Sequence, residues 1–418
     1  MSRSRRASPW LLTAALGPAA WAVIACAAPR LASADPCDME TGEVLYIAGP
    51  DSMINVLRGI AAELWNEDTK VFYRGYPSCL GTLNIVNNAP TTPDPAEIGT
   101  PEAHLVSFWP GDPDAEMQCD LPFDAEDEAE PEILADIVLS DVFPTTCASF
   151  PNGLGSVQDF QGPALGFGFI VHPDSSAQSI SAEAAYLTYG FGAESNVVSP
   201  WTDPTTILHR DPNSGTENIF AKTLGLDVTK WAGTSLNSTS VLLGQVADAT
   251  GVDVDTTIGG ANVSILDKLR DELRLLAYQH YDQTCGYFPD STLTSFDKRN
   301  LRDGHYPIWG VVHILTRVDD GGLPVKDGAN RFINLVLGTD EIAGLDPIAL
   351  EAQSGIIPQC AMNVLRDEDG GPLASTQPLR PCGCYFESLV GDTDCDSCTS
   401  STECPDERPN CSFGFCEF

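Results

Sequence analysis

Basic residues are scarce in this sequence. Lys and Arg together number 22 among 418 residues, against 59 Asp and Glu, which gives a formal net charge of −37 at pH 7. From residue 75 to residue 209 there is no Lys or Arg at all. Because nucleic acids and anionic membrane surfaces are bound by clustered cations, neither is an expected partner of this chain.

Signatures of common enzymes and metal sites are also missing. The six His are dispersed, and none has the spacing of metal ligands. No Gly-x-Ser-x-Gly motif, the turn that carries the nucleophile of many hydrolases, occurs in the chain. We therefore expect no enzyme and predict no catalytic residue, cofactor or bound metal. A secreted hydrolase is the enzyme alternative.

Beyond the N-terminus, no segment is long and apolar enough to span a bilayer. Residues 1–34 have the pattern of a signal peptide: three Arg within the first six residues, an apolar stretch over Trp10–Ala28, then small residues before Asp35. Cleavage after Ala34 is one expectation. The other is lipidation at Cys26, because Val23-Ile24-Ala25-Cys26 resembles a lipobox, and this lipid is the only membrane attachment expected. Both predict export to the periplasm or the cell surface.

The fourteen Cys agree with export, because disulfides persist in oxidising compartments. Thirteen lie beyond Cys26, an odd number, so at least one is free or pairs between chains. Seven crowd residues 382–418, a segment with too few aliphatic residues to form a core without cross-links. We expect at least three disulfides in this tail. The alternative is zinc, for which Cys395-x-x-Cys398 supplies one half-site and nothing supplies a second.

Short apolar strands alternate with helical patterns through the body of the chain, which predicts α/β layers with largely parallel sheets. Helices are expected after Ser52, over Ile265–Tyr281 and over Ala329–Leu337. Two apolar strands, Phe167–Val171 and Ile308–Leu315, are expected to cross between two lobes. The expected domains are residues 35–165 with 308–365 as one lobe, 166–307 as the other, a linker at 366–381 and a disulfide-rich tail at 382–418.

Residues 89–135 have the composition of an insertion, rich in Pro, Asp and Glu. Within it, six of the ten residues in the run Phe123–Glu132 are acidic. A solvated surface loop is the simpler interpretation. A cation site is the alternative, although the spacing is not that of a calcium loop.

The strongest chemical signal comes where the stretch without cations ends. Arg210 is followed by Ser214-Gly215-Thr216 and at once by a helical pattern. The first N–H groups of a helix lack partners and carry partial positive charge, so a small anion can bind there. Gly215 permits close approach of the backbone, while the hydroxyls and the guanidinium add donors. The pattern predicts an oxyanion site; the alternative is that Ser214 or Thr216 only caps the helix.

Two further turns have a matching character. Asp51-Ser52-Met53 follows the first predicted strand, and Gly75-Tyr76-Pro77-Ser78 follows the second. Both lie at the carboxyl ends of strands, where α/β sheets place their ligands. Asp141 follows a later strand in the same way.

This order of motifs resembles the solute-binding proteins of phosphate ABC transporters, over roughly residues 42–358. The resemblance implies a type II periplasmic-binding-protein fold, with two α/β lobes and a hinge of two crossing strands. It implies that the protein captures phosphate or a similar oxyanion and delivers it to the membrane subunits of an ABC transporter. The ligand-binding residues it implies are Ser52, Met53, Ser78, Asp141, Arg210, Ser214, Gly215 and Thr216.

The chain departs from this family at its proposed clamp. The family has an acidic residue two positions after the Arg, where it tethers the guanidinium; here Pro212 stands there and Asp211 comes one position earlier. Asn213 replaces the usual Gly, and Asp51 adds a carboxylate to the first loop. The alternative function is therefore a cell-surface interaction protein that has lost or changed its ligand.

Overall fold

A computed structural model describes Cys37 and residues 41–91, 105–120, 134–148, 150, 153–191, 198–391 and 393–418. The expected signal peptide, the lipidation candidate Cys26 and the acidic run Phe123–Glu132 lie outside the described residues. None of the described helices combines the length and the apolar character needed to cross a membrane.

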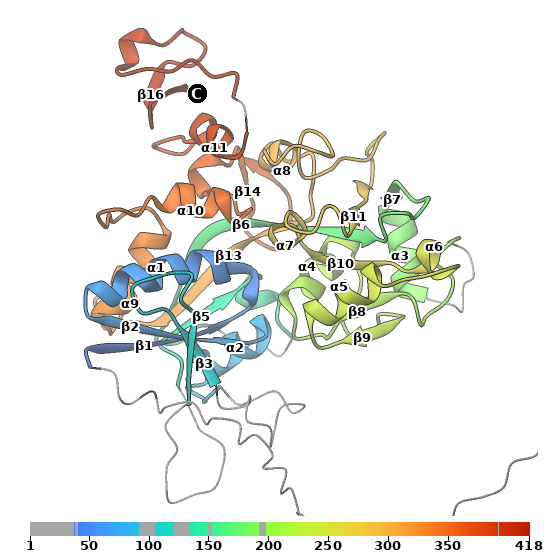
Figure 1. Cartoon of the computed structure of the whole chain (residues 1–418), viewed down its shortest axis with the longest axis horizontal. Helices are drawn as coiled ribbons and strands as arrows, with labels where there is room; N and C mark the ends of the chain where they lie inside the picture. Colours follow the sequence, from blue (N-terminus) through green and yellow to red (C-terminus); the bar gives the residue numbers. More distant parts are fainter. Residues whose placement is uncertain are drawn as a thin grey trace, which may run out of the picture. The chain divides into compact units, whose positions relative to one another are not determined.

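The body is built on one large mixed sheet, with its strands in the order β10-β6-β13-β5-β1-β2-β3-β4 and with β11 beside β6 (Figure 1). Strand β1 pairs in parallel with β2 and β5, but the remaining pairs of this sheet are antiparallel. The mixed α/β fold is confirmed, whereas the expectation of largely parallel pairing is wrong, because the crossing strands β6 and β13 and the edge strands β3 and β4 all pair antiparallel. The strands are β1 Glu43–Gly49, β2 Thr69–Gly75, β3 Leu105–Phe108, β4 Met117–Asp120, β5 Ile137–Ser140, β6 Val157–Val171, β10 Gly259–Asn262, β11 Arg274–Leu275 and β13 Trp309–Arg317.

Two predicted helices of the first lobe are confirmed. Helix α1 (Ile54–Asn66) follows the turn that contains Ser52, and its buried residues repeat at helical spacing. Helix α9 (Asp327–Val336) ends just before Gly338, whose φ of 63° is a left-handed conformation that favours glycine.

Strand β6 is shared by both halves of the body. Its residues 157–166 pair with β13, and its residues 167–171 pair with β10 and β11. The second connection runs beside it, because the Phe167 N–H donates to the Ile308 carbonyl at 2.9 Å and the Tyr306 hydroxyl donates to the Phe167 carbonyl at 2.7 Å. Hydrogen bonding is continuous through this one strand, while the flanking strands belong to one half or the other. This arrangement agrees with two lobes joined by two crossing segments; the predicted lobe limits stay predictions.

The second lobe packs around Phe169 on β6. The ring centroid of Phe169 lies 4.6 Å from that of Phe220, 5.8 Å from that of Tyr189 and 6.0 Å from that of Tyr278. All four side chains are buried. Because Phe220 belongs to α4 (Gly215–Leu224), this aromatic core fixes the helix that carries the predicted anion site against the shared strand.

The predicted helix over Ile265–Tyr281 is wrong. Only α7 (Val263–Leu266) is helical, and the chain then forms β11 and β12 (Ala277–Gln279). Strand β11 pairs with β6, and β12 pairs with β7 (Ser179–Ser181). Strands β6 and β7 therefore supply backbone partners from distant parts of the sequence. Such tertiary pairing overrides the helical tendency that the spacing of the Leu residues indicates.

Residues 366–381, predicted to be a linker, begin at the tip of a hairpin. Strand β14 (Val364–Leu365) pairs antiparallel with β15 (Ala374–Ser375). At the tip, Arg366 and Asp369 are only 4 % and 5 % exposed. The tip is therefore part of the folded body, and its contacts are described with the site.

Disulfides cross-link both the body and the tail. Cys285, which is exposed, is the free cysteine of the described residues, as the odd count implied. The body contains Cys37–Cys119 and Cys79–Cys147, and Cys360–Cys382 joins the body to the tail. The tail, in red in Figure 1, contains Cys384–Cys395, Cys398–Cys411 and Cys404–Cys416, so the prediction of at least three disulfides there is confirmed. These bonds use the sulfurs that a zinc site would need.

Candidate functional site

The predicted residues of the first lobe come together at one edge of the sheet. Ser52 and Met53 lie in η2 (Asp51–Met53) after β1, Ser78 begins α2 (Ser78–Val86) after β2, and Asp141 follows β5. Because β1, β2 and β5 run parallel as neighbours, their carboxyl ends meet there.

Hydrogen bonds connect three of these residues directly. The Ser52 hydroxyl donates to Asp141 Oδ1 at 2.5 Å, and the Asp141 N–H donates to Ser78 Oγ at 3.2 Å. All three are buried, as is Met53. The first lobe thus presents two hydroxyls and a carboxyl group as a preformed cluster.

The predicted residues of the second lobe lie at the start of α4. Ser214 is the N-cap residue, but its hydroxyl makes no capping hydrogen bond. The turn is held instead by Asn218, whose side-chain amide donates to the carbonyls of Pro212 and Ser214, both at 2.8 Å. Ser214 and Thr216 are nevertheless buried. Their hydroxyls are therefore not explained by simple capping of the helix.

The two sets of residues meet at Gly215. A Cβ atom added to Gly215 would lie 2.5 Å from Ser78 Oγ and 2.7 Å from Asp141 Cβ. Beside this contact, the Cys79 N–H donates to the Asn213 carbonyl at 3.1 Å. The first turn of α4 therefore rests directly on the first-lobe cluster, and any side chain at position 215 would separate the two.

Arg210, at the end of β8 (Leu208–Arg210), is held by its own lobe. Its Nε donates to the Leu236 carbonyl at 3.1 Å, its Nη2 donates to the Asn237 carbonyl at 2.8 Å, and its Nη1 donates to Thr239 Oγ1. Asp211 stands 3.8 Å from the guanidinium, so the acid that comes one position early still pairs with Arg210. Among the described residues, no direct hydrogen bond joins Arg210 to Ser52, Ser78 or Asp141, although its charge influences Asp141.

Asp141 is the most perturbed acid of the cluster. Complete burial raises its pKa from 3.8 to about 7, while the Ser52 hydrogen bond and the Arg210 charge act in the opposite direction. The carboxyl groups of Asp51 and Asp369 raise the pKa of Asp141 further. Near neutral pH, Asp141 is therefore present in both forms and can either accept a hydrogen bond or donate one.

Two residues of this region were not predicted. Glu217, 2 % exposed, accepts from the Arg210 N–H at 3.1 Å and lies 3.1 Å from His209 Nδ1. Burial raises its pKa from 4.5 to about 7. Asp369 lies on the hairpin tip, far from the motifs in the sequence. A glutamate in the first turn of a helix is ordinarily a solvated residue, and Asp369 stands in a Gly- and Asp-rich stretch, so neither position gave a local signal.

Asp369 and its neighbours tie the hairpin tip to both lobes. Asp369 Oδ2 accepts from the Phe143 N–H at 2.9 Å and from the Thr146 hydroxyl at 2.7 Å, which fixes the loop after Asp141. Arg366 Nη1 donates to the Trp309 carbonyl at 3.1 Å, and the Arg366 guanidinium lies 4.1 Å from the centre of the Trp309 ring.

The hairpin tip also contacts the second lobe, through Gly370. Its φ is +69°, and an added Cβ would lie 2.8 Å from the Lys222 carbonyl group near the end of α4. Only glycine suits both this backbone conformation and this close approach. The tip therefore touches the first lobe, a crossing strand and the helix of the candidate site.

The raised pKa of Asp141 predicts a pH dependence of stability. Because the native state favours the protonated carboxyl, the free energy of unfolding should fall as pH rises from about 4 to about 7. Asp141→Asn keeps the size and shape of the side chain but removes its ionisable carboxyl group. We therefore expect the free energy of unfolding of this variant to fall less between about pH 4 and about pH 7 than that of wild type. Urea unfolding at closely spaced pH values measures the slope, with the exposed Asp271→Asn as a matched control. Equal slopes for wild type and Asp141→Asn would contradict the prediction.

Comparison with known proteins supports the fold. No family model matches the chain, and no curated protein matches it. Among solved structures, it is similar to a candidate phosphate ABC transporter substrate-binding protein with bound phosphate from Clostridium perfringens, at 12 % identity and a TM-score of 0.50 over 76 % of this chain and 99 % of that one. At this identity the similarity shows a shared periplasmic-binding-protein-like fold.

Two other solved structures match more distantly. An ABC-type phosphate transport receptor from Vibrio cholerae is 14 % identical, with a TM-score of 0.46 over 76 % of this chain and 100 % of that one. A PstS from Borrelia burgdorferi is 13 % identical, with a TM-score of 0.39 over 76 % of this chain and 98 % of that one.

Proposed function

We propose that this chain is an exported solute-binding protein that captures a small oxyanion, with phosphate as the leading ligand, for an ABC-type uptake system. The observation that carries the proposal is the contact of Gly215 with Ser78 and Asp141. It joins a helix start to a buried polar cluster at the carboxyl ends of parallel strands, which is where α/β folds bind ligands. The similar structure from Clostridium perfringens, with its bound phosphate, supports the same choice.

The chemistry of the eight residues suits a partly protonated oxyanion. The first N–H groups of α4 and the hydroxyls of Ser52, Ser78, Ser214 and Thr216 are donors for its oxygens. The two N–H groups that remain on the Arg210 guanidinium add charge-assisted donors. Asp141 accepts a hydrogen bond from a protonated phosphate oxygen but repels fully ionised sulfate.

Export and attachment belong to the same proposal. Six disulfides fit an oxidising compartment, that is, the periplasm or the cell surface. The membrane subunits of an ABC transporter would receive the solute, and a lipid on Cys26 would be the membrane anchor if the signal peptide is not cleaved after Ala34.

Calorimetry on the oxidised mature protein tests the ligand. We expect phosphate to bind and sulfate to bind more weakly, with arsenate and molybdate as further probes. Failure of all four anions to bind would overturn the proposal. Hydrolysis of a coloured phosphoester would support the hydrolase alternative instead.

Arg210→Ala should weaken phosphate binding at least about tenfold, because a hydrogen bond to a charged group contributes roughly 1.5–3 kcal/mol and 1.4 kcal/mol is one decade. Asp141→Asn should instead improve sulfate binding while phosphate binding falls only modestly, since the repelling charge is removed. Calorimetry with both anions on both variants measures the four affinities. If Arg210→Ala binds phosphate like wild type, Arg210 is not part of the clamp.

A second candidate function is favoured by the way Arg210 is held. Its guanidinium donates to three acceptors of its own lobe, and Gly215 already contacts the opposite lobe. A cell-surface interaction protein that keeps this fold without an anion would retain both features. It would show no shift in melting temperature with any of the four anions.

A further inference from the structure

The Cys384–Cys395 disulfide lies at a cavity between the tail and the body. The cavity has a volume of about 590 Å³, and its lining includes both of these cysteines. Cys384 stands in the first turn of α11 (Gly383–Val390) and is buried, whereas Cys395 is half-buried. The half-buried sulfur can therefore be reached by a molecule that enters the cavity.

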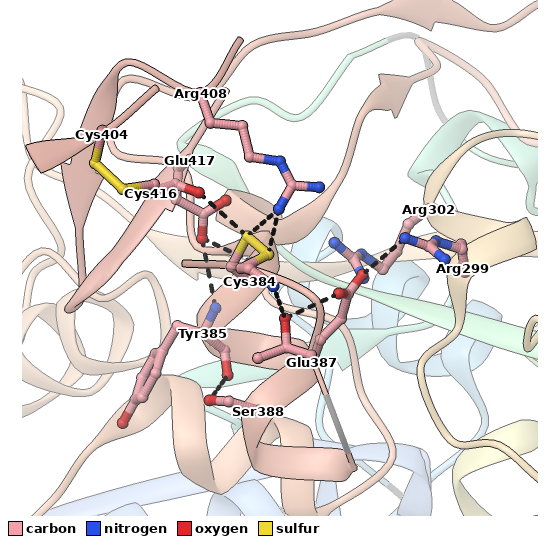
Figure 2. The surroundings of a disulfide bond; sticks show 12 residues. Arg299, Arg302, Cys384, Tyr385, Glu387, Ser388, Cys404, Arg408, Cys416 and Glu417 are labelled. Carbon is pink, nitrogen blue, oxygen red and sulfur yellow. Dashed lines mark hydrogen bonds and ion pairs between the residues drawn. A yellow bond between two sulfur atoms is a disulfide. The ribbon is translucent and has the colours of Figure 1, made fainter. Parts of the chain in front are cut away.

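A guanidinium group lies against this disulfide. Arg408 Nη1 is 2.7 Å from Cys395 Sγ and 3.6 Å from Cys384 Sγ, as Figure 2 shows for the labelled Arg408 and Cys384. Arg408 forms no ion pair with a carboxylate among the residues that the structure describes. A neutral disulfide gains little from a permanent cation, but a thiolate gains a great deal. The Arg408 contact therefore stabilises the reduced state, with its thiolate, more than it stabilises the disulfide.

The N-terminus of α11 also favours a thiolate at Cys384. A thiolate at a helix N-terminus is stabilised by the aligned peptide dipoles, and Cys384 occupies this position. Glu417 accepts from the N–H groups of Cys384 and Tyr385, at 2.7 and 3.4 Å, which fixes the first turn but adds a negative charge.

Cations on the far side of the cavity offset the nearby carboxylates. Arg302 Nη1 donates to Glu387 Oε1 at 2.9 Å, and Arg299 lies 3.9 Å from the same oxygen. Figure 2 shows both arginines converging on Glu387 below the disulfide. Three arginines of the lining, Arg299, Arg302 and Arg408, thus balance its three acids, Asp303, Glu387 and Glu417, so the cavity is about neutral in a chain with 22 basic and 59 acidic residues.

The other two disulfides of the tail are natural references. Cys384–Cys395 spans 11 residues, while Cys398–Cys411 spans 13 and Cys404–Cys416 spans 12. Each joins one buried and one half-buried cysteine. Neither has an arginine within bonding distance of its sulfurs in the described parts of the chain. Loop length and burial are thus matched, and Cys384–Cys395 differs by its Arg408 contact, its place at the start of α11 and its position at the cavity.

We propose that Cys384–Cys395 is a thiol–disulfide exchange site whose substrate is a dithiol, either a small molecule or an exposed pair of cysteines on another protein. A thiolate of the dithiol attacks Cys395 Sγ, the S–S bond breaks, and its electron pair leaves on Cys384 Sγ. The second thiolate of the dithiol then attacks the dithiol sulfur that is bonded to Cys395. This closes a disulfide within the dithiol and releases Cys395 as a thiolate. The dithiol is oxidised to a disulfide, and each released cysteine takes one proton from water.

The Cys360–Cys382 bond determines what such exchange can do. It attaches the chain just before α11 to the body, so reduction of Cys384–Cys395 frees the following segment without releasing the tail. The two remaining bonds of the tail stay closed. The exchange site is therefore a reversible cross-link inside a module that remains attached.

Timed reduction of the intact oxidised protein tests this proposal. Samples are treated with dithiothreitol, alkylated and mapped by mass spectrometry, so that the rate is obtained for each disulfide. We expect Cys384–Cys395 to open about tenfold faster than the two reference bonds, because a better-stabilised leaving thiolate departs faster. Equal rates for the three tail disulfides, or slower opening of Cys384–Cys395, would overturn the proposal.

Two variants separate the guanidinium effect from general loosening of the tail. Arg408→Gln should slow the opening of Cys384–Cys395 toward the reference rate and leave the other two unchanged. Arg380→Gln is the matched control, because Arg380 stacks on Phe413 at 4.7 Å in the same region without touching a disulfide. If Arg408→Gln accelerates all three bonds, it has destabilised the fold, and the wild-type rates alone then decide. If it folds and leaves the Cys384–Cys395 rate unchanged, the proposal is wrong.

Discussion

Replacing Gly215 by alanine should weaken oxyanion binding about 10- to 100-fold, because the new Cβ would lie 2.5 Å from Ser78 Oγ and 2.7 Å from Asp141 Cβ. Overpacking of this kind costs about 1–3 kcal/mol, and 1.4 kcal/mol is one decade of affinity. The helix itself should not suffer, since alanine is the better helix former. Calorimetry with phosphate gives the affinity, and thermal unfolding shows whether the variant is folded.

Gly244→Ala is the matched control for this experiment. Gly244 lies in α5 (Thr239–Ala247) of the same lobe, and an added Cβ there meets nothing within 4 Å. We expect this control to bind like wild type and to be slightly more stable. A Gly215→Ala protein that keeps wild-type affinity would show that binding does not require the contact between α4 and the first-lobe cluster.

Phe169→Ala should lower the free energy of unfolding by about 3–5 kcal/mol, the usual cost of removing a buried aromatic ring. The Phe169 ring contacts Phe220 of α4, and it lies on the strand that both lobes share. The loss should therefore weaken the support of the candidate site as well as the core. Urea unfolding measures the change.

The control for the core substitution is Phe191→Ala. Phe191 is 49 % exposed at the end of α3 (Ala182–Phe191), so its loss should cost no more than about 0.5 kcal/mol. Similar losses in the two variants would mean that the aromatic cluster around Phe169 does not hold the second lobe together.

The structure brings together those predicted site residues whose sequence signal is local. Ser52, Ser78 and Asp141 each follow a strand directly, and parallel neighbours bring such positions to one edge without further information. Gly215 stands at a helix start that its own neighbours define. For these residues, the spacing along the chain and the geometry of strands and helices are sufficient.

Features that depend on distant partners could not be predicted in this way. The direction of the Arg210 side chain is set by the carbonyls of Leu236 and Asn237, which lie in another loop. Asp369 reaches the loop after Asp141 across 226 residues of sequence. The helix expected over Ile265–Tyr281 failed for the same reason, because its backbone pairs with strands that periodicity cannot reveal.

Under the proposed function, the buried tip of the β14–β15 hairpin bears on the timing of solute capture. To open, the two lobes must withdraw the tip from Phe143 and Thr146 on one side or from Lys222 on the other. On the side of Phe143 and Thr146, opening would break two buried hydrogen bonds to Asp369, which would favour the closed population before a solute arrives. A preclosed site binds its solute with less free energy lost to closure, but it admits the solute only during infrequent openings. If the proposed function holds, the hairpin would slow the entry of a solute and lengthen its residence.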